Sequence, residues 1–355
     1  MKISNFIALC FLFCFNLFAA TDYSIQKITY LNISASINPA VKNYIESNLE
    51  KTSKNPGGLL VIKLDTPGGL VSTTKEILTL IGDSDIPVGV WITPEGASAT
   101  SAGAIIASGA HILVMNDGTN IGAATPITMG KDIDQKDARA KAINDLVALV
   151  RSLSKVRGRN PEAFEKMISE AESLDSQTAL EEKVIDAIVH KEKDFKDFLA
   201  GLEINLKGEA LKLQVSDSVE SETIDMDPGQ QALNIFANPT TAYILFIIGA
   251  ALLYFEFQAP GGFVAGAVGV IFLVLAAIGF QVLPLNFGAM GLIVLSFILF
   301  ILEIFITSFG VLTIAGIASL VFGSLFLFRT ENSYIELEQT AIWSTVAAVS
   351  LYVIF

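Results

Sequence analysis

Hydrophobic and polar positions divide the chain into three parts. Residues 1–20 contain an apolar run from Phe6 to Phe18. Short apolar runs separated by polar, helix-like or turn-rich stretches follow. From Asn238 onward, long apolar runs succeed one another with little between them. This pattern predicts an export signal, a domain that alternates strands and helices, and a block of membrane helices.

The middle part has the pattern of an α/β domain. Four strand-like runs are each followed by a helical or turn-rich stretch: Ile28–Ile37, Leu59–Leu64, Val88–Ile92 and Ile112–Met115. A chain of about 180 residues can bury a full core, so we predict a single domain over residues 21–213. Residues 214–237 are rich in Asp, Glu and Ser, and we interpret them as a solvated tether whose charges repel one another.

The C-terminal part, residues 238–355, is predicted to be an all-α multi-pass membrane domain. It begins with Asn238-Pro239, a helix cap followed by proline at the first helical position. The earlier apolar runs are long enough to cross about 30 Å of hydrocarbon. The expected helices cover residues 239–257, 262–283, 288–307, 309–328 and 340–355. Because the last run reaches the C-terminus, we expect that the chain is a truncation of a longer sequence.

Two segments of the membrane part resemble each other. The segment from Glu256 to Val264 aligns without gaps on the segment from Glu303 to Val311. We interpret them as a duplicated helix pair, each with a glutamate near one end and a Gly-rich return into the next helix. Two roles are open for these carboxylates: a buried proton or ion group, or a cap on the Gly-rich turn.

Composition and charge restrict the class of protein. The chain is 52% hydrophobic and 17% charged, which is too apolar for one water-soluble globule. Lys2 and the apolar run after it are typical of a secretory signal, cleaved or retained as an anchor, so the α/β domain is expected to be extracytoplasmic at the cell membrane. The net charge of −13 comes with no basic field, which argues against a nucleic-acid partner.

The sequence offers few residues for a metal site or for catalysis by histidine. Cys10 and Cys14 both lie in the signal segment, so the remaining chain has no disulfide and no thiolate metal site. His111 and His190 lie far apart and form no HExxH motif. We therefore predict no metal or other cofactor and interpret both histidines as structural or surface residues.

Two segments place small residues where a ligand could approach the backbone. A buried strand that starts at Leu59 runs into Pro67-Gly68-Gly69, whose glycines can expose N–H groups. The stretch from Pro94 to Ala104 sets hydroxyls and small residues between a strand and an apolar helix, where backbone donors are open. Either segment could also be an ordinary tight connection.

A serine nucleophile without a usable histidine requires a lysine base, and an amine serves when burial disfavours its charged form. Lys131 and Lys136 lie among aspartates, which hold them charged. Lys141 lies in the first turn of an expected helix over 138–153. The alternative for Lys141 is a solvent-facing ion pair with Asp145.

The motifs as a set resemble the NfeD-like, Clp-class membrane serine proteases. They are Asp65-Thr-Pro-Gly-Gly-Leu70, Ala99-Thr-Ser-Ala-Gly103, Gly122-Ala-Ala-Thr-Pro126, Lys141-Ala-Ile-Asn144, Arg151-Ser-Leu and Arg157-Gly-Arg-Asn160. The resemblance covers the signal, the α/β domain to about residue 200 and the membrane helices. It implies a crotonase-like, Clp-protease-like ββα spiral fold and a Ser-Lys dyad.

The resemblance also implies site roles, position by position. Ser101 matches the nucleophile and Lys141 the general base. Gly69 and Ala102 match the backbone donors of the oxyanion hole. The substrate-binding positions are Gly68, Leu70, Gly122 and Ala123. Ser98 is a rival nucleophile, because Gly96-Ala-Ser98 fits a nucleophile elbow about as well by spacing.

The chain departs from the family in two respects. No histidine lies between His111 and His190, which favours a dyad over the triad of soluble Clp proteases. The OB-type β-barrel domain of long family members is absent or truncated.

The function implied by the resemblance is a membrane serine endopeptidase that cleaves hydrophobic segments. It implies polypeptide substrates, stomatin- or prohibitin-like membrane partners and a homodimer of the protease domain. The alternatives are a non-catalytic membrane scaffold for such partners and a signal-peptide-degrading protease with the same dyad.

Overall fold

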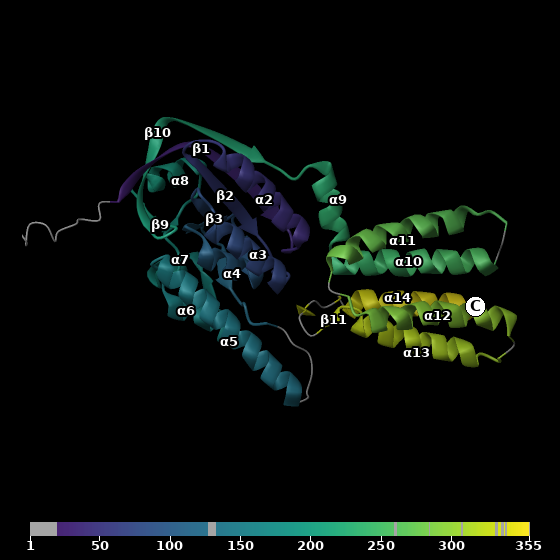
Figure 1. The fold of residues 1–355 in the computed structure, drawn as a ribbon. Coiled ribbons are helices and arrows are strands. Elements are labelled where there is room, and N and C mark those ends of the chain that lie inside the picture. The colour runs from purple at the N-terminus through teal and green to yellow at the C-terminus, as the bar shows by residue number, and fades with distance from the viewer. Residues whose placement is uncertain are drawn as a thin grey trace, which may run out of the picture.

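The computed structural model describes residues 20–126, 133–258, 261–283, 285–306, 308–330, 333–334, 337 and 339–354. The expected signal over residues 1–20 lies outside them except for Ala20. Figure 1 shows a sheet-containing domain and a bundle of helices, with one short helix between them.

A seven-stranded sheet forms the centre of the N-terminal domain (Figure 1). Its order is β8-β5-β3-β2-β1-β10-β9, and all neighbours are parallel except β10 and β9. The strands are β1 (Thr21–Ser34), β2 (Gly58–Asp65), β3 (Val88–Ile92), β5 (Ile112–Met115), β8 (Ala187–Ile188), β9 (Glu203–Leu206) and β10 (Glu209–Ile224). The four strands predicted from sequence are all present.

The central strands are buried because helices cover both faces of the sheet. Leu60 and Ile62 point into a core shared with the helices on one face. Leu59 and Val61 alternate with them and pack on the other face, in the same core as Phe195. The covering helices are α2 (Pro39–Ser53), α3 (Val71–Gly82), α4 (Ala102–Gly109), α5 (Ile133–Val156), α6 (Pro161–Ser169), α7 (Ser176–Glu181) and α8 (Glu192–Leu199).

A second, three-stranded sheet creates the spiral character of the domain. It consists of β4 (Ser98–Thr100), β6 (Asn120–Gly122) and β7 (Ser173–Asp175). The order β3-β4-α4 repeats as β5-β6-α5, with the first strand of each unit in the large sheet and the second in the small one. These ββα units agree with the predicted spiral fold, and they place the turn between β4 and α4 at the junction of the two sheets.

The acidic segment 214–237 is not an unstructured tether, so that interpretation was wrong. Strand β10 runs to Ile224 and pairs in parallel with β1, and helix α9 (Pro228–Phe236) follows. One of the acidic side chains has a charged partner on β1: Glu222 forms an ion pair of 2.9 Å with Lys27. Backbone pairing with β1, together with this ion pair, therefore holds the acidic segment in the sheet.

The C-terminal part folds into helices at all five expected places. They are α10 (Pro239–Gln258), α11 (Val264–Val282), α12 (Phe287–Phe305), α13 (Val311–Phe326) and α14 (Gln339–Ile354). Within the described residues, three segments are long and apolar enough to cross a membrane: 239–258, 264–281 and 287–305. Helix α13 is apolar but shorter.

The two glutamates of the internal repeat cap the helices that follow them. The Glu256 carboxylate accepts the N–H groups of Phe263 at 3.0 Å and Gly266 at 3.2 Å. The Glu303 carboxylate accepts those of Gly310 and Thr313, both at 3.1 Å. In both copies, the glutamate accepts the N–H groups of the residues seven and ten positions after it. This geometry supports the capping role over a free proton or ion group.

Candidate active site

Ser101 stands at the sharp turn between β4 and α4. Its φ of 54° and ψ of −110° lie where residues with a side chain seldom occur, which costs about 1–3 kcal/mol. Its N–H donates to the Gly122 carbonyl at 3.0 Å, and its carbonyl accepts the Ile105 N–H at 3.2 Å. These bonds hold the strained turn in place and present the hydroxyl at the N-terminal end of α4.

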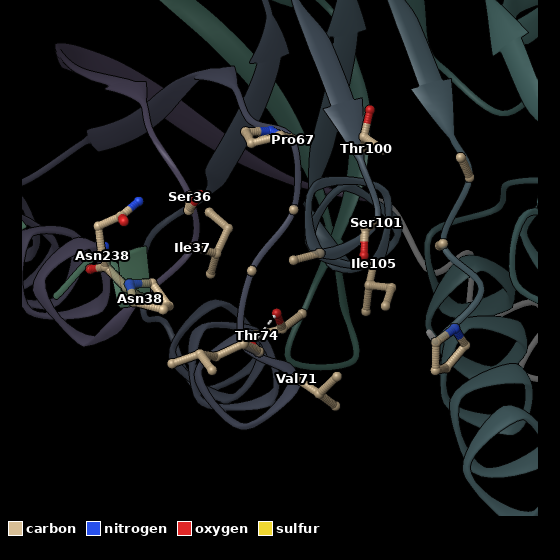
Figure 2. A pocket seen from close by; sticks show the side chains of 18 of the residues that line it. Ser36, Ile37, Asn38, Pro67, Val71, Thr74, Thr100, Ser101, Ile105 and Asn238 are labelled. Carbon is tan, nitrogen blue, oxygen red and sulfur yellow. Dashed lines mark hydrogen bonds between the residues drawn. The ribbon is translucent and has the colours of Figure 1, made fainter. Parts of the chain in front are cut away.

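A cavity of about 390 Å³ surrounds the Ser101 side chain (Figure 2). Four segments of the α/β domain line it, and residues at the membrane-domain boundary complete it. The α/β segments are 36–38, 67–71, 100–102 and 123–126, together with Thr74, Ile105 and Leu146. The boundary residues are 237–240 and Leu283.

Gly68 lies directly against the Ser101 side chain. Its φ is +127°, and a Cβ built on it would come 2.8 Å from Ser101 Cβ and 3.2 Å from Ser101 Oγ. The Gly68 carbonyl accepts the Ile37 N–H at 2.8 Å, which anchors this turn to the segment after β1. Only glycine therefore leaves room for the Ser101 hydroxyl at this position.

Two backbone N–H groups near Ser101 have no hydrogen-bond acceptor within the described residues. A parallel bridge joins Gly69 to Ile37, and a Cβ on Gly69 would lie 2.1 Å from the Ile37 carbonyl oxygen. Gly69 and Ala102 both line the cavity. Among the described residues, neither the Gly69 N–H nor the Ala102 N–H donates to a protein acceptor. Such a pair of donors beside a hydroxyl is suited to holding an oxyanion.

Gly68→Ala is expected to lower catalytic turnover strongly while the protein stays folded. The new methyl group would press on Ser101 and adopt an unfavourable backbone conformation, so we expect about a hundredfold loss of turnover. Hydrolysis of peptides, the activity implied by the sequence resemblance, and far-UV circular dichroism measure the two effects separately. Gly96→Ala is the matched control, because Gly96 also has a positive φ, 86°, but nothing lies within 4 Å of its added Cβ. Equal activity of the two variants would contradict this account of Gly68.

The other expected substrate-binding positions differ in their placement. Leu70 and Ala123 line the cavity. The Ala123 N–H donates to the Glu172 carbonyl at 2.7 Å and is therefore already used. Gly122 does not line the cavity. Its carbonyl accepts the Ser101 N–H and so helps to hold the turn at Ser101. A Cβ on Gly122 would lie 2.2 Å from the Glu172 carbonyl oxygen and would collide with it.

The rival serine is engaged elsewhere. The Ser98 hydroxyl donates to Asn120 Oδ1 at 2.5 Å, and the Ser98 N–H donates to Asp65 Oδ1 at 3.0 Å. Ser98 is not among the residues that line the Ser101 cavity. This geometry favours Ser101 as the nucleophile.

Lys141 lies on α5 and is exposed. In the described part of the chain, Lys141 neither lines the Ser101 cavity nor forms a hydrogen bond with Ser101. Asp145, its alternative partner, instead forms an ion pair of 2.6 Å with Lys75 of α3. The structure therefore does not bring Ser101 and Lys141 together, and it does not show the Lys141–Asp145 pair either. Sequence spacing could not reveal this, because the position of α5 depends on packing.

Neither histidine lies in the cavity. His190 is exposed, and its Nδ1 is 3.8 Å from Asp117. His111 is buried, and its Nδ1 accepts the Val88 N–H at 3.2 Å. Burial, followed by the charges of Arg157 and Arg159, lowers the pKa of His111 to about 3. The described residues contain no group of three His, Cys, Asp or Glu side chains that could hold a metal ion.

The buried His111 predicts acid sensitivity of the fold. An unfolded histidine binds a proton near pH 6.5, whereas the folded His111 stays neutral until about pH 3. The free energy of unfolding is therefore expected to fall by up to about 1.4 kcal/mol per pH unit as the pH drops from about 6 toward 3. His111→Gln should flatten this dependence in denaturant titrations across that range. An identical slope in the variant would rule out His111 as the cause.

Comparisons with known proteins agree with both parts of the chain. The model of the NfeD1b N-terminal domain matches residues 27–196, and that of the NfeD integral membrane domain matches residues 240–355. Membrane-bound protease PH1510 of Pyrococcus horikoshii is 29% identical over 323 residues, 90% of this chain and 73% of that protein. Membrane protein NfeD1b of Bacillus subtilis is 27% identical over 315 residues, 85% of this chain and 67% of that protein.

Solved structures match the α/β domain. A mutant of the 1510-N membrane-bound stomatin-specific protease, with a serine changed to alanine, has a TM-score of 0.53 and 26% identity, and the match covers 57% of this chain and 99% of that one. A mutant with a lysine changed to alanine, in complex with a substrate peptide, has a TM-score of 0.51 and 27% identity, covering 57% and 93%. The α/β domain thus has a Clp-like protease fold.

Proposed function

This chain is an NfeD-like membrane protease by its similarity over both parts, and from that premise we propose that it is a serine endopeptidase with Ser101 as nucleophile and Lys141 as general base. The observation that carries the proposal is the strained turn at Ser101. It presents a hydroxyl to a cavity beside two open backbone donors, Gly69 and Ala102. A strained residue kept at a cavity is typical of a catalytic position.

In the proposed reaction, the Ser101 Oγ attacks a peptide carbonyl carbon while Lys141 Nζ takes the hydroxyl proton. The carbonyl oxygen becomes an oxyanion that accepts the N–H groups of Gly69 and Ala102. Lys141 then gives the proton to the leaving amine, and water hydrolyses the resulting ester by the same route. Each oxyanion donor is expected to contribute about two to three orders of magnitude in turnover.

The proposal requires the part of α5 that carries Lys141 to approach Ser101, although Leu146 of the same helix already lines the cavity. In the present arrangement Lys141 is exposed, and the burial that a neutral lysine base requires is not in place. The ion pair between Lys75 and Asp145 holds α5 against α3, but both side chains are substantially exposed. Such a pair contributes no more than about 1 kcal/mol. Breaking it therefore costs little when this part of α5 approaches Ser101. Substrate binding could supply this amount.

The proposed substrates are apolar polypeptide segments of membrane proteins. The cavity lining includes Ile37, Val71 and Ile105, which suit an apolar side chain. A solved relative is described as a stomatin-specific protease. We extend this to the present chain as stomatin- or prohibitin-like partners. The extracytoplasmic orientation and a homodimer of the α/β domain belong to the same proposal.

The test is hydrolysis by the purified full chain in detergent or nanodiscs. Apolar peptides and charged peptides of the same length are compared, and cleavage of the apolar set is the expected result. The exposed position of Lys141 favours one alternative, a scaffold that binds peptides without cutting them. Peptide binding with no hydrolysis by the wild type would support that alternative and contradict the protease.

A further inference from the structure

Helix α9 fastens the α/β domain to the membrane domain (Figure 1). On one side, the Asn38 amide at the start of α2 donates to Asn234 Oδ1 of α9 at 2.7 Å, and Asn38 is buried. On the other side, the Phe236 carbonyl oxygen at the end of α9 lies so close to Gly279 of α11 that a Cβ there would be 2.1 Å away. Helix α9 therefore contacts both the α/β domain and the membrane domain.

This attachment brings the edge of the membrane domain to the Ser101 cavity. Residues 237–240, where α10 starts, line the cavity, and so does Leu283, which follows α11. Because α10 and α11 form an antiparallel hairpin, these residues lie at the same end of the bundle. The apolar span of α10 begins at Pro239, so this end marks the membrane surface.

Asn238 offers the cavity an unused polar group. Figure 2 shows Asn238 on the opposite side of the pocket from Ser101, close to Asn38 and Ser36. Its Oδ1 accepts the Thr241 N–H at 3.1 Å and so caps α10. Its amide NH₂ donates to no acceptor within the described residues, and the same holds for the Ser36 hydroxyl. Pro239 and Leu283 also line the cavity and supply apolar surface.

We propose that the membrane domain forms one end of the substrate site, so that the enzyme cleaves membrane-anchored polypeptides at bonds immediately beside the membrane surface. The Asn238 amide binds a carbonyl of the substrate backbone, and Leu283 with Pro239 contacts the apolar residue where the substrate leaves the membrane. This specificity rests on the proposed protease function. The restricted cavity holds a short extended stretch of chain and not a folded segment.

The first experiment moves one cleavable sequence away from the membrane. The full chain is reconstituted in liposomes with single-span reporters whose cleavable sequence follows the span directly or after Gly/Ser spacers of increasing length. We expect the fastest cleavage with no spacer and a decline of at least about tenfold with the longest spacer. Cleavage that does not depend on the spacer would overturn the inference while leaving the protease function intact. Equal inactivity of the wild type and Ser101→Ala on every reporter would overturn both.

The second experiment separates the Asn238 amide from its capping role. Asn238→Asp keeps an oxygen that can cap α10 but removes the NH₂ donor. Asn286→Asp makes the same change at the cap of α12, where the Asn286 Oδ1 accepts the Ala289 N–H and the residue does not line the cavity. We expect Asn238→Asp to raise the KM for the spacer-free reporter about tenfold, and Asn286→Asp to leave it unchanged. Equal KM values for the two variants would overturn the role of Asn238.

Discussion

Replacing Ser101 by alanine is expected to reduce peptide hydrolysis by three orders of magnitude or more, about the loss seen when a catalytic nucleophile is removed. Ser101 lines the cavity together with Gly69 and Ala102, whose N–H groups donate to no protein acceptor among the described residues. Binding should persist, because the variant removes one oxygen atom from a cavity lined by many residues. Single-turnover cleavage of an apolar peptide and equilibrium binding of the same peptide measure the two effects.

Ser98→Ala is the matched control for Ser101→Ala. It removes the same atom three residues earlier, where the hydroxyl bonds to Asn120 outside the cavity. We expect it to keep most of the wild-type turnover and to lose roughly 1 kcal/mol of stability with the hydrogen bond. If Ser98→Ala abolishes cleavage and Ser101→Ala does not, then Ser98 is the nucleophile.

Replacing Lys141 by alanine is expected to reduce turnover to a similar extent, because a serine hydroxyl is a weak nucleophile without a base. Lys141→Arg should not restore activity, since a guanidinium group keeps its proton at any working pH. The Ser101→Ala/Lys141→Ala double variant should be about as slow as either single variant, as expected when two groups act as a unit. Hydrolysis rates of the wild type and the four variants on one peptide provide the measurement.

Lys155→Ala provides the control for Lys141→Ala. Lys155 is also exposed and lies in the last turn of the same helix. It should keep the wild-type rate. Because the proposed reaction needs Lys141 to reach Ser101, this comparison separates loss of the proposed base from a general disturbance of α5. A wild-type rate for Lys141→Ala would mean that another group takes the Ser101 proton.

The elements of the fold could be predicted where hydrophobic spacing is strong. Strands such as β2 and β3 are apolar runs bounded by turns, and they are buried on both faces. The membrane helices follow from the length of their apolar runs. The C-terminal half of strand β10 escaped prediction, because the sequence after Val215 is acidic with no apolar alternation and its partner β1 lies almost 200 residues away. Backbone hydrogen bonds stabilise such a pairing whatever the polarity of the side chains.

The features of the candidate site also differ in whether local sequence predicts them. The turn with Gly68 and Gly69 is recognisable from local sequence, because its conformation depends on small residues within a few positions. The role of Ser101 was implied only by the resemblance to the family. The choice between Ser98 and Ser101 required the β4–β6 pairing, which engages one hydroxyl and leaves the other facing the cavity.

Local sequence thus suffices for the types of element and for the chemistry of the turns. Long-range packing sets the rest: Lys141 stands apart from Ser101 on an exposed face of α5, and residues of the membrane domain complete the cavity. These relations join residues far apart in the chain, and their geometry follows from how whole helices and sheets bury apolar surface against one another. Spacing along a sequence carries no direct record of that packing.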